Sequence, residues 1–203
     1  MDYLRAKFMD RIGVSKEAYC LTCPGGHSWG DSGILCKPTD LLKVARFVMN
    51  GGNWEGEQIL DRTYVEEATK KQVDNDLWDA NECTTQGYGY QFWRTFEDSY
   101  FFNGMGCQLA VCVPHKDMIL VYNGDNQGNG VAEKVILDHF FEMLVDTAEE
   151  EPLKDTGEDW RRLMEYAGGL RLVRAPGAKN SPCRDRIDRA TYRMDKGDPF
   201  RWM

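Results

Sequence analysis

The chain has 203 residues, 42% of them hydrophobic and 29% charged, which suits one domain with a buried core and a piece of another. Its formal net charge of -8 argues against nucleic acid as a main partner, because phosphate binding needs clustered Lys and Arg. Apolar runs stay well below the roughly 18 residues of a membrane helix, and the N-terminus lacks the apolar segment of a secretory signal, so we expect no membrane partner.

The cysteines point to a reducing environment. Seven is an odd number, which excludes a complete disulfide framework. Cys107 and Cys112 fall in predicted strands, where a free cysteine behaves as a small apolar residue. We therefore expect a cytoplasmic protein, and a signal lost with a missing N-terminus is the alternative.

The first third of the chain predicts two helices separated by a glycine-rich loop. Residues 2–12 have apolar residues at helical spacing and stop at Gly13. Residues 24–34 contain four glycines and predict a loop, and residues 38–50 predict a second helix. The apolar face of that second helix comprises Leu41, Val44, Ala45, Val48 and Met49.

The middle of the chain predicts a short helix and then strands. Asp61 is a candidate cap for a helix over residues 62–72, and residues 74–86 are polar and irregular. Three strands are expected over residues 88–95, 107–113 and 118–124. The run before the second strand, residues 101–106, has two glycines beside large apolar residues. Glycine at such a place lets a ligand approach the backbone N–H groups.

The last part predicts a long helix and a change of domain. Residues 131–146 form the helix, whose apolar face we expect to include His139 as a packed residue. The segment 149–189 predicts a connector with a short helix over residues 158–166. Residues 190–194 look like one strand without a partner, so we expect residues 190–203 to begin a further β-domain and residues 1–148 to form the main domain.

Two short motifs suggest catalysis or calcium, but a turn explains each of them better. Residues 30–33 read Gly-Asp-Ser-Gly, as around the nucleophile of trypsin-like proteases. That triad needs a His and an Asp far upstream, and the one preceding His is His27, three residues before the motif. Residues 125–130 begin like a calcium loop, but the twelfth position is Ile136, where a bidentate Glu is required.

A third motif suggests zinc. Cys20, Cys23, His27 and Cys36 are possible zinc ligands, although the second pair of a structural zinc site is absent. We expect no metal, and a zinc protein built on these four residues stays an alternative.

Several segments, in order, resemble one known family. They are residues 1–13, 25–52, 59–65 (Ile-Leu-Asp-Arg-Thr-Tyr-Val), 87–93 (Gly-Tyr-Gly-Tyr-Gln-Phe-Trp) and 103–117, which opens Asn-Gly-Met-Gly-Cys-Gln. Together they resemble the C-terminal part of the serine β-lactamase-like family, which groups class C β-lactamases, D-alanyl-D-alanine peptidases, esterases and aminohexanoate-oligomer hydrolases. The resemblance implies an α+β fold, an antiparallel sheet with flanking helices.

The resemblance also implies a place for the chemistry. In the family, a Ser in Ser-x-x-Lys attacks a carbonyl, a Tyr in Tyr-x-Asn assists, and an edge strand reading Lys-Thr-Gly donates an N–H to the oxyanion. The matching strand here implies Asn103 and Gly104 as pocket wall and the backbone N–H of Met105 as oxyanion donor. The resemblance also implies Phe102 as a substrate-binding residue. It stands where the family has a Lys or His, so the pocket loses a cation, which disfavours carboxylate-bearing β-lactams.

The resemblance further implies that the glycine-rich loop approaches the site, with His27, Trp29 and Asp31 at the pocket rim. A tight turn that supports the following helix is the alternative for this loop.

Both catalytic motifs, Ser-x-x-Lys and Tyr-x-Asn, are absent from the sequence. We therefore expect a fragment of a serine hydrolase for small-molecule amides or esters, without a cofactor, that lacks its nucleophile and is inactive alone. Its partner would be the missing N-terminal half of the same domain. A non-catalytic binding or scaffold domain derived from that fold is the alternative.

Overall fold

The computed structural model describes residues 1–30, 32–76, 81–151, 157–171, 177 and 181–188. The chain divides into two compact units, Met1–Glu150 and Glu151–Met203. Two expectations lie outside the described residues, namely Asp31 at the pocket rim and the strand over residues 190–194.

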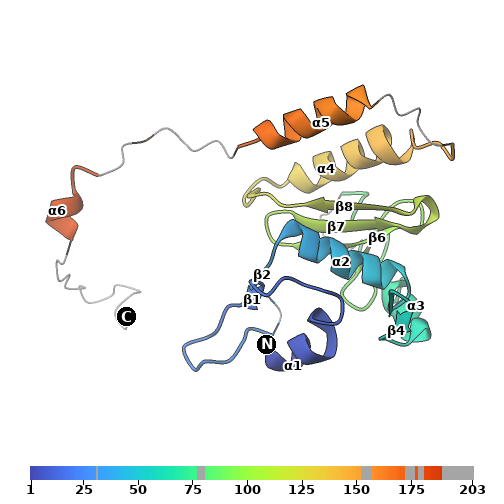
Figure 1. Cartoon of the computed structure of the whole chain (residues 1–203), viewed down its shortest axis with the longest axis horizontal. Coiled ribbons are helices and arrows are strands. Elements are labelled where there is room, and N and C mark those ends of the chain that lie inside the picture. The colour runs from blue at the N-terminus through green and yellow to red at the C-terminus, as the bar shows by residue number, and fades with distance from the viewer. Residues whose placement is uncertain (31, 77–80, 152–156, 172–176, 178–180, 189–203) are drawn as a thin grey trace. The chain divides into compact units, whose positions relative to one another are not determined.

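The first unit is built around a four-stranded antiparallel sheet with strand order β5-β6-β7-β8 (Figure 1). The strands are β5 (Trp93–Arg94), β6 (Tyr100–Gly104), β7 (Gln108–Val113) and β8 (Met118–Tyr122). The second and third expected strands are confirmed as β7 and β8, whereas only two residues of the first expected strand pair as β5. The glycine-containing run was expected to precede a strand, and it instead forms β6 and the hairpin turn that follows.

Strand β6 is not a complete edge strand, which differs from the family pattern. It pairs with β7 along its whole length, but β5 pairs only with Tyr100 and Phe101. The part of β6 from Phe102 to Gly104 therefore has an open side among the described residues. This is the part that the resemblance assigns to the site.

Helices cover both faces of the sheet, because side chains alternate along each strand. Tyr100, Ala110 and Cys112 face α2 (Pro38–Met49). Phe101, Leu109, Val111 and Val113 face α4 (Ala132–Phe140) and the π-helical turn that continues it, η3 (Phe141–Val145). Figure 1 shows α2 and α4 on opposite sides of the strands. The predicted α+β class is confirmed.

Helix α2 forms where the sequence predicts it. Pro38 occupies its first turn, the Asp40 side chain accepts a hydrogen bond from Lys37 N–H, and Gly51 ends it with φ +66°. Its predicted apolar face contacts the sheet, with Ala45 fully buried. Phe47, outside that face, packs against Phe8 at 5.0 Å between ring centroids, so the helix is buried on a second side as well.

Helix α4 begins where expected, but its buried face differs from the prediction. The core residues are Leu137, Phe140 and Phe141, whereas His139 is exposed and its Nδ1 lies 2.8 Å from Val135 O. The expectation that His139 packs in the core is therefore wrong. A helix with apolar residues on nearly all sides does not reveal from sequence which of them meets the sheet.

The remaining elements of the first unit are short. Helix α3 has Asp61 as its cap, since Asp61 Oδ1 accepts a hydrogen bond from Tyr64 N at 3.1 Å. The other elements are α1 (Asp2–Leu4), η1 (Arg5–Met9), β1 (Tyr19–Cys20), β2 (Ile34–Leu35), β3 (Asn53–Trp54), β4 (Glu57–Gln58), α3 (Arg62–Thr69) and η2 (Pro114–Lys116).

The second unit contains α5 (Glu158–Gly169), longer than the expected helix over residues 158–166, and α6 (Arg184–Ile187). Across the described parts of both units, none of the helices combines the length and the apolar character required to cross a bilayer.

Candidate functional site

An open cavity of about 530 Å³ lies at the β6–β7 hairpin. Three segments line it, namely residues 103–107, residues 126–130 and Glu133 at the start of α4. Asn103, Gly104 and Met105 therefore lie together around one cavity. The assignment of a catalytic role to them stays a prediction.

The hairpin turn exposes Met105 to solvent beside the cavity. Gly104 pairs with Gln108, and the turn between them contains two left-handed residues, Gly106 (φ +76°) and Cys107 (φ +65°). The Met105 residue is 81% exposed. Its backbone N–H donates no hydrogen bond among the described residues. A free N–H at an open cavity can receive an acceptor atom of a ligand.

Gly104 is required by the space around it. A Cβ at this position would lie 2.9 Å from the Cβ of Gln108 and 3.2 Å from its carbonyl oxygen. The hairpin would have to open to admit any side chain there. The glycine therefore keeps the two strands close beside the exposed N–H.

The loop between β8 and α4 forms the second wall of the cavity. The N–H of Asn126 donates to Gly106 O at 3.2 Å, and the Asn126 side-chain amide donates to the same oxygen at 3.4 Å. These bonds tie the loop to the hairpin turn. The sequence predicts a turn over residues 125–130, but not that this turn lies beside the hairpin. That position depends on contacts between residues 20 apart in the chain.

Glu133 completes the cavity from α4. Its carboxylate accepts a hydrogen bond from the side-chain amide of Asn103. Burial raises the pKa of the Glu133 carboxyl, and the bond from Asn103 opposes that rise. Glu133 does not stand out in the sequence, because a Glu in the first turn of a helix is expected from the helix dipole alone.

Cys107 also lines the cavity, but it is not an activated thiol. Burial raises its pKa above the ordinary value of 9.0, and the negative charge of Glu133 raises it further. A nucleophilic cysteine needs a lowered pKa. No serine or threonine is found among the described residues that line the cavity. The cavity thus offers a hydrogen-bond donor and a carboxylate without a nucleophile.

Phe102 does not line the cavity. It lies on the α2 face of the sheet, where its ring contacts Phe92 at 5.0 Å between centroids. Side-chain alternation places Asn103 on the other face, beside Glu133. The apolar replacement at this position is thus separated from the cavity by the sheet.

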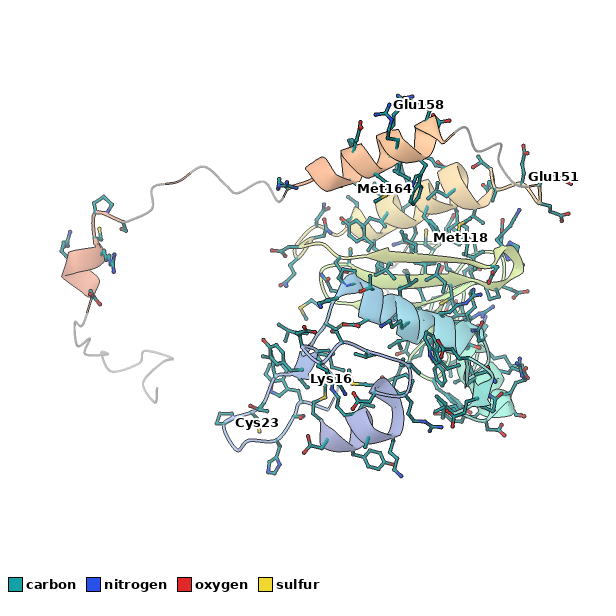
Figure 2. All side chains as sticks on the ribbon, in the orientation of Figure 1. Lys16, Cys23, Met118, Glu151, Glu158 and Met164 are labelled. Carbon is teal, nitrogen blue, oxygen red and sulfur yellow. The ribbon has the colours of Figure 1, made fainter. Side chains whose placement is uncertain are left out.

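The glycine-rich loop makes contacts mainly with itself. The N–H of Cys23 donates to His27 O at 2.9 Å, and the N–H of Trp29 donates to Leu21 O at 3.1 Å. His27 and Trp29 are both exposed, and neither lines the cavity. Figure 2 shows Cys23 on a loop that projects from the body of the first unit. This geometry favours the tight turn, and the rim role of His27 and Trp29 stays a prediction.

The cysteine cluster does not assemble a zinc site. Cys20 is buried, and its sulfur lies 3.6 Å from Trp29 O, while Cys36 is exposed. Within the part of the chain that the structure describes, no three His, Cys, Asp or Glu side chains are grouped so as to hold a metal ion. The zinc alternative therefore has no structural support.

Comparison with solved structures identifies the fold. A Bacillus anthracis protein assigned as a 6-aminohexanoate-dimer hydrolase matches with a TM-score of 0.55 at 18% identity, over 70% of this chain. A Bacteroides dorei protein assigned as a β-lactamase matches with a TM-score of 0.50 at 14% identity, over 68% of this chain. The chain has part of the β-lactamase-like fold. No family model matches the sequence, and no curated protein matches it.

This chain corresponds to only a part of each solved structure. This chain spans 38% of the Bacillus anthracis protein and 50% of the Bacteroides dorei protein. The fold that the resemblance implies is thus confirmed for a portion of such a domain.

Proposed function

We propose that this chain contributes one wall of the active site of a serine hydrolase for amides or esters. The observation that carries the proposal is that the backbone N–H of Met105, in the turn directly after β6, donates no hydrogen bond among the described residues and lies at an open cavity. The family resemblance assigns the oxyanion donor to this position. An N–H aimed at the developing oxyanion is worth about 3 kcal/mol of transition-state stabilisation. The side chain of Met105 is not needed for this role.

The nucleophile would come from polypeptide outside this sequence, the missing N-terminal half of the domain. The absence of Ser-x-x-Lys and the raised pKa of Cys107 support this division of labour. The catalytic step would then be attack of that external serine on the substrate carbonyl, with the oxyanion received by Met105 N–H. The chain alone would be inactive.

Strand β8 supports the presence of a partner segment. It is the last strand of the sheet, so its outer edge is unpaired among the described residues. Its five residues are Met, Ile, Leu, Val and Tyr, all half-buried. An apolar edge without charge or proline is an unprotected template for another strand. We propose that the missing half pairs here.

The compartment is also a proposal. All seven cysteines are free, which supports a reducing environment such as the cytoplasm.

The test begins with the 203-residue chain alone, assayed with nitrocefin and with p-nitrophenyl esters. We expect no turnover above buffer. The chain is then co-expressed with the coding sequence that lies immediately upstream in its genome, in which we expect Ser-x-x-Lys and Tyr-x-Asn. Steady activity of the chain alone that a serine reagent abolishes would contradict the missing nucleophile.

Two variants test the oxyanion donor in the co-expressed protein. Met105→Pro removes the N–H and should lower kcat by about 100-fold or more, as loss of an oxyanion donor does elsewhere. Met105→Ala keeps the N–H and should retain most of the activity. Equal activity of the two variants would contradict the role, and an upstream sequence without either motif would favour the binding or scaffold alternative.

A further inference from the structure

The sequence contains four Asn-Gly pairs, at residues 50–51, 103–104, 123–124 and 129–130. Such a pair can react with itself. The backbone nitrogen of the glycine attacks the side-chain carbon of the asparagine and closes a succinimide ring, while the N–H proton leaves with the side-chain nitrogen as ammonia. Water then opens the ring to aspartate or to isoaspartate. Glycine favours ring closure, because it has no Cβ that would crowd its nitrogen.

Two of the four pairs are held by backbone hydrogen bonds. Gly51 is buried, and its N–H donates to Val48 O at 2.9 Å. Asn103 and Gly104 lie in β6 and pair with β7, and the Asn103 side-chain amide donates to Glu133. Ring closure at either pair therefore requires a local opening of the structure first.

The third pair is held by Gln108 at both of its residues. Gln108 Oε1 accepts a hydrogen bond from the Asn123 side-chain amide at 2.9 Å, and Gln108 Nε2 donates to Gly124 O. The space around this pair is also filled, since a Cβ at Gly124 would lie 2.8 Å from the Tyr122 ring and from the Asn126 side chain. This pair is thus restrained as well.

The fourth pair is open. Asn129 and Gly130 are both exposed in the loop before α4, and a Cβ at Gly130 would meet no atom within 4 Å. Among the described residues, neither the Gly130 N–H nor the Asn129 Nδ2 donates a hydrogen bond. Asn129 Oδ1 accepts the N–H of Val131 at 3.4 Å, which draws electrons away from the side-chain carbon. The attacking nitrogen, the carbon that it attacks and the leaving nitrogen are all accessible here.

We propose that Asn129 is a site of spontaneous deamidation, and that the cavity gains a carboxylate there as the protein ages. Asn129 and Gly130 both line the cavity. An aspartate at this position would accept the Val131 N–H with a charged oxygen, which the positive end of α4 stabilises. An isoaspartate would lengthen the backbone of the cavity wall by one carbon. This chemistry goes beyond the proposed function and does not depend on it.

Peptide mapping by mass spectrometry tests the reaction in the 203-residue chain. The native chain is incubated in mildly alkaline buffer, sampled over time and digested with pepsin in acid, where ring closure is slow. The readout is the rate at which each of the four asparagines becomes aspartate or isoaspartate. We expect Asn129 to convert about tenfold faster than the other three, because each of those must first break one or two hydrogen bonds.

Unfolded chain and two variants show whether the structure sets this order. In urea, all four pairs should convert at similar rates, because the same glycine follows each asparagine. Gly130→Ala should slow conversion of Asn129 about tenfold, since a Cβ crowds the attacking nitrogen. Gln108→Ala removes both bonds that hold the third pair, and should raise the rate at Asn123 toward that at Asn129 without changing the latter. Circular dichroism reports whether each variant is folded.

Equal rates at the four asparagines of the native chain, or faster conversion at one of the other three, would overturn the proposal. A native rate at Asn129 far below its rate in urea would do the same, because the loop would then protect the pair. An unchanged rate in Gly130→Ala would show that Gly130 is not the attacking residue, and would also overturn it.

Discussion

Ser15 gives two hydrogen bonds to the buried carboxylate of Asp40, from its N–H at 2.8 Å and from its hydroxyl at 2.5 Å. The same carboxylate accepts the N–H of Lys37 at 3.2 Å, so it joins the segment after the N-terminal helix to the start of α2. Asp40 is 2% exposed. Asp40 thus joins two segments of the scaffold.

Removal of this carboxylate should destabilise the fold strongly. Asp40→Ala leaves the two half-buried donors of Ser15 without their acceptor, and each unsatisfied group costs up to about 1–3 kcal/mol. Asp61→Ala is the matched control, because Asp61 is an exposed helix cap whose loss costs about 1 kcal/mol. Urea denaturation measures both. An Asp40→Ala loss no larger than that of Asp61→Ala would contradict the structural role.

The contribution of Asp40 should depend on pH. Burial by itself would raise the pKa of Asp40, but the hydrogen bonds from Ser15 and Lys37 outweigh it and hold the pKa below the ordinary value of 3.8. A carboxyl with a lowered folded-state pKa stabilises the protein above its unfolded-state pKa, and this stability is lost as the pH falls through the folded-state pKa. The difference in unfolding free energy between the wild type and Asp40→Ala should therefore shrink below about pH 4. A difference that stays constant as the pH falls would contradict the lowered pKa of Asp40.

Two glycines with positive φ should respond very differently to alanine. A Cβ at Gly52 (φ +79°) would lie 2.6 Å from Leu60 O, whereas a Cβ at Gly56 (φ +91°) would meet nothing within 4 Å. Gly56→Ala should cost about 1 kcal/mol, from backbone strain alone. Gly52→Ala adds a clash with backbone and should cost about 3 kcal/mol or more. Thermal and urea unfolding of both variants and of the wild type measures the two losses of stability. Equal losses would disprove the close packing at Gly52.

The buried face of α4 can be tested with a pair of variants on that helix. Leu137 is fully buried against the sheet, so Leu137→Ala should lose about 2–5 kcal/mol of stability. His139 is exposed, and His139→Ala should change stability by less than about 0.5 kcal/mol. Chemical denaturation distinguishes these values clearly. A large loss from His139→Ala would restore the face that the sequence predicts.

Thiol reactivity should separate the seven cysteines into classes. Cys36 and Cys183 are exposed and should be the first to react with Ellman's reagent, Cys36 more slowly because partial burial of its sulfur and the charge of Asp40 raise the pKa of its thiol. Burial raises the pKa of Cys83 and of Cys112 to about 12, so both should stay unreacted until the protein unfolds. A Cys36→Ser, Cys183→Ser double variant should lose the fast phase, and rapid labelling of Cys112 in native protein would contradict its position in the core.

The local pattern of the sequence was enough to place most elements of the first unit. Helix α2 has a proline at its start, a periodic apolar face and glycines after its end, and each of these acts within a few residues. Strands β7 and β8 are apolar runs between turn residues, which identifies them as strands, and the structure buries β7 and half-buries β8. The order of the motifs also indicated the β-lactamase-like fold, which the solved structures confirm.

Local pattern was not enough where a residue's environment comes from distant segments. Cys83 lies in a stretch that is polar and irregular, yet it is fully buried, and its thiol donates to Asp138 at 3.3 Å across 55 residues. Helix α4 has apolar residues on several sides, so only contact with the sheet decides that Leu137 is inside and His139 outside. Such choices depend on packing between elements, which propensity does not encode.

The sequence by itself determined most elements of the first unit, the absence of the family's catalytic motifs and the candidate segment over residues 103–105, because these follow from residue types and spacings along the chain. Only the tertiary structure decided that Asn103 meets Glu133, that Phe102 is turned to the other face, and that the loop after β8 closes the cavity. The physical reason is the alternation of side chains across the sheet, together with the hydrogen bonds from Asn126 that bring two distant turns together.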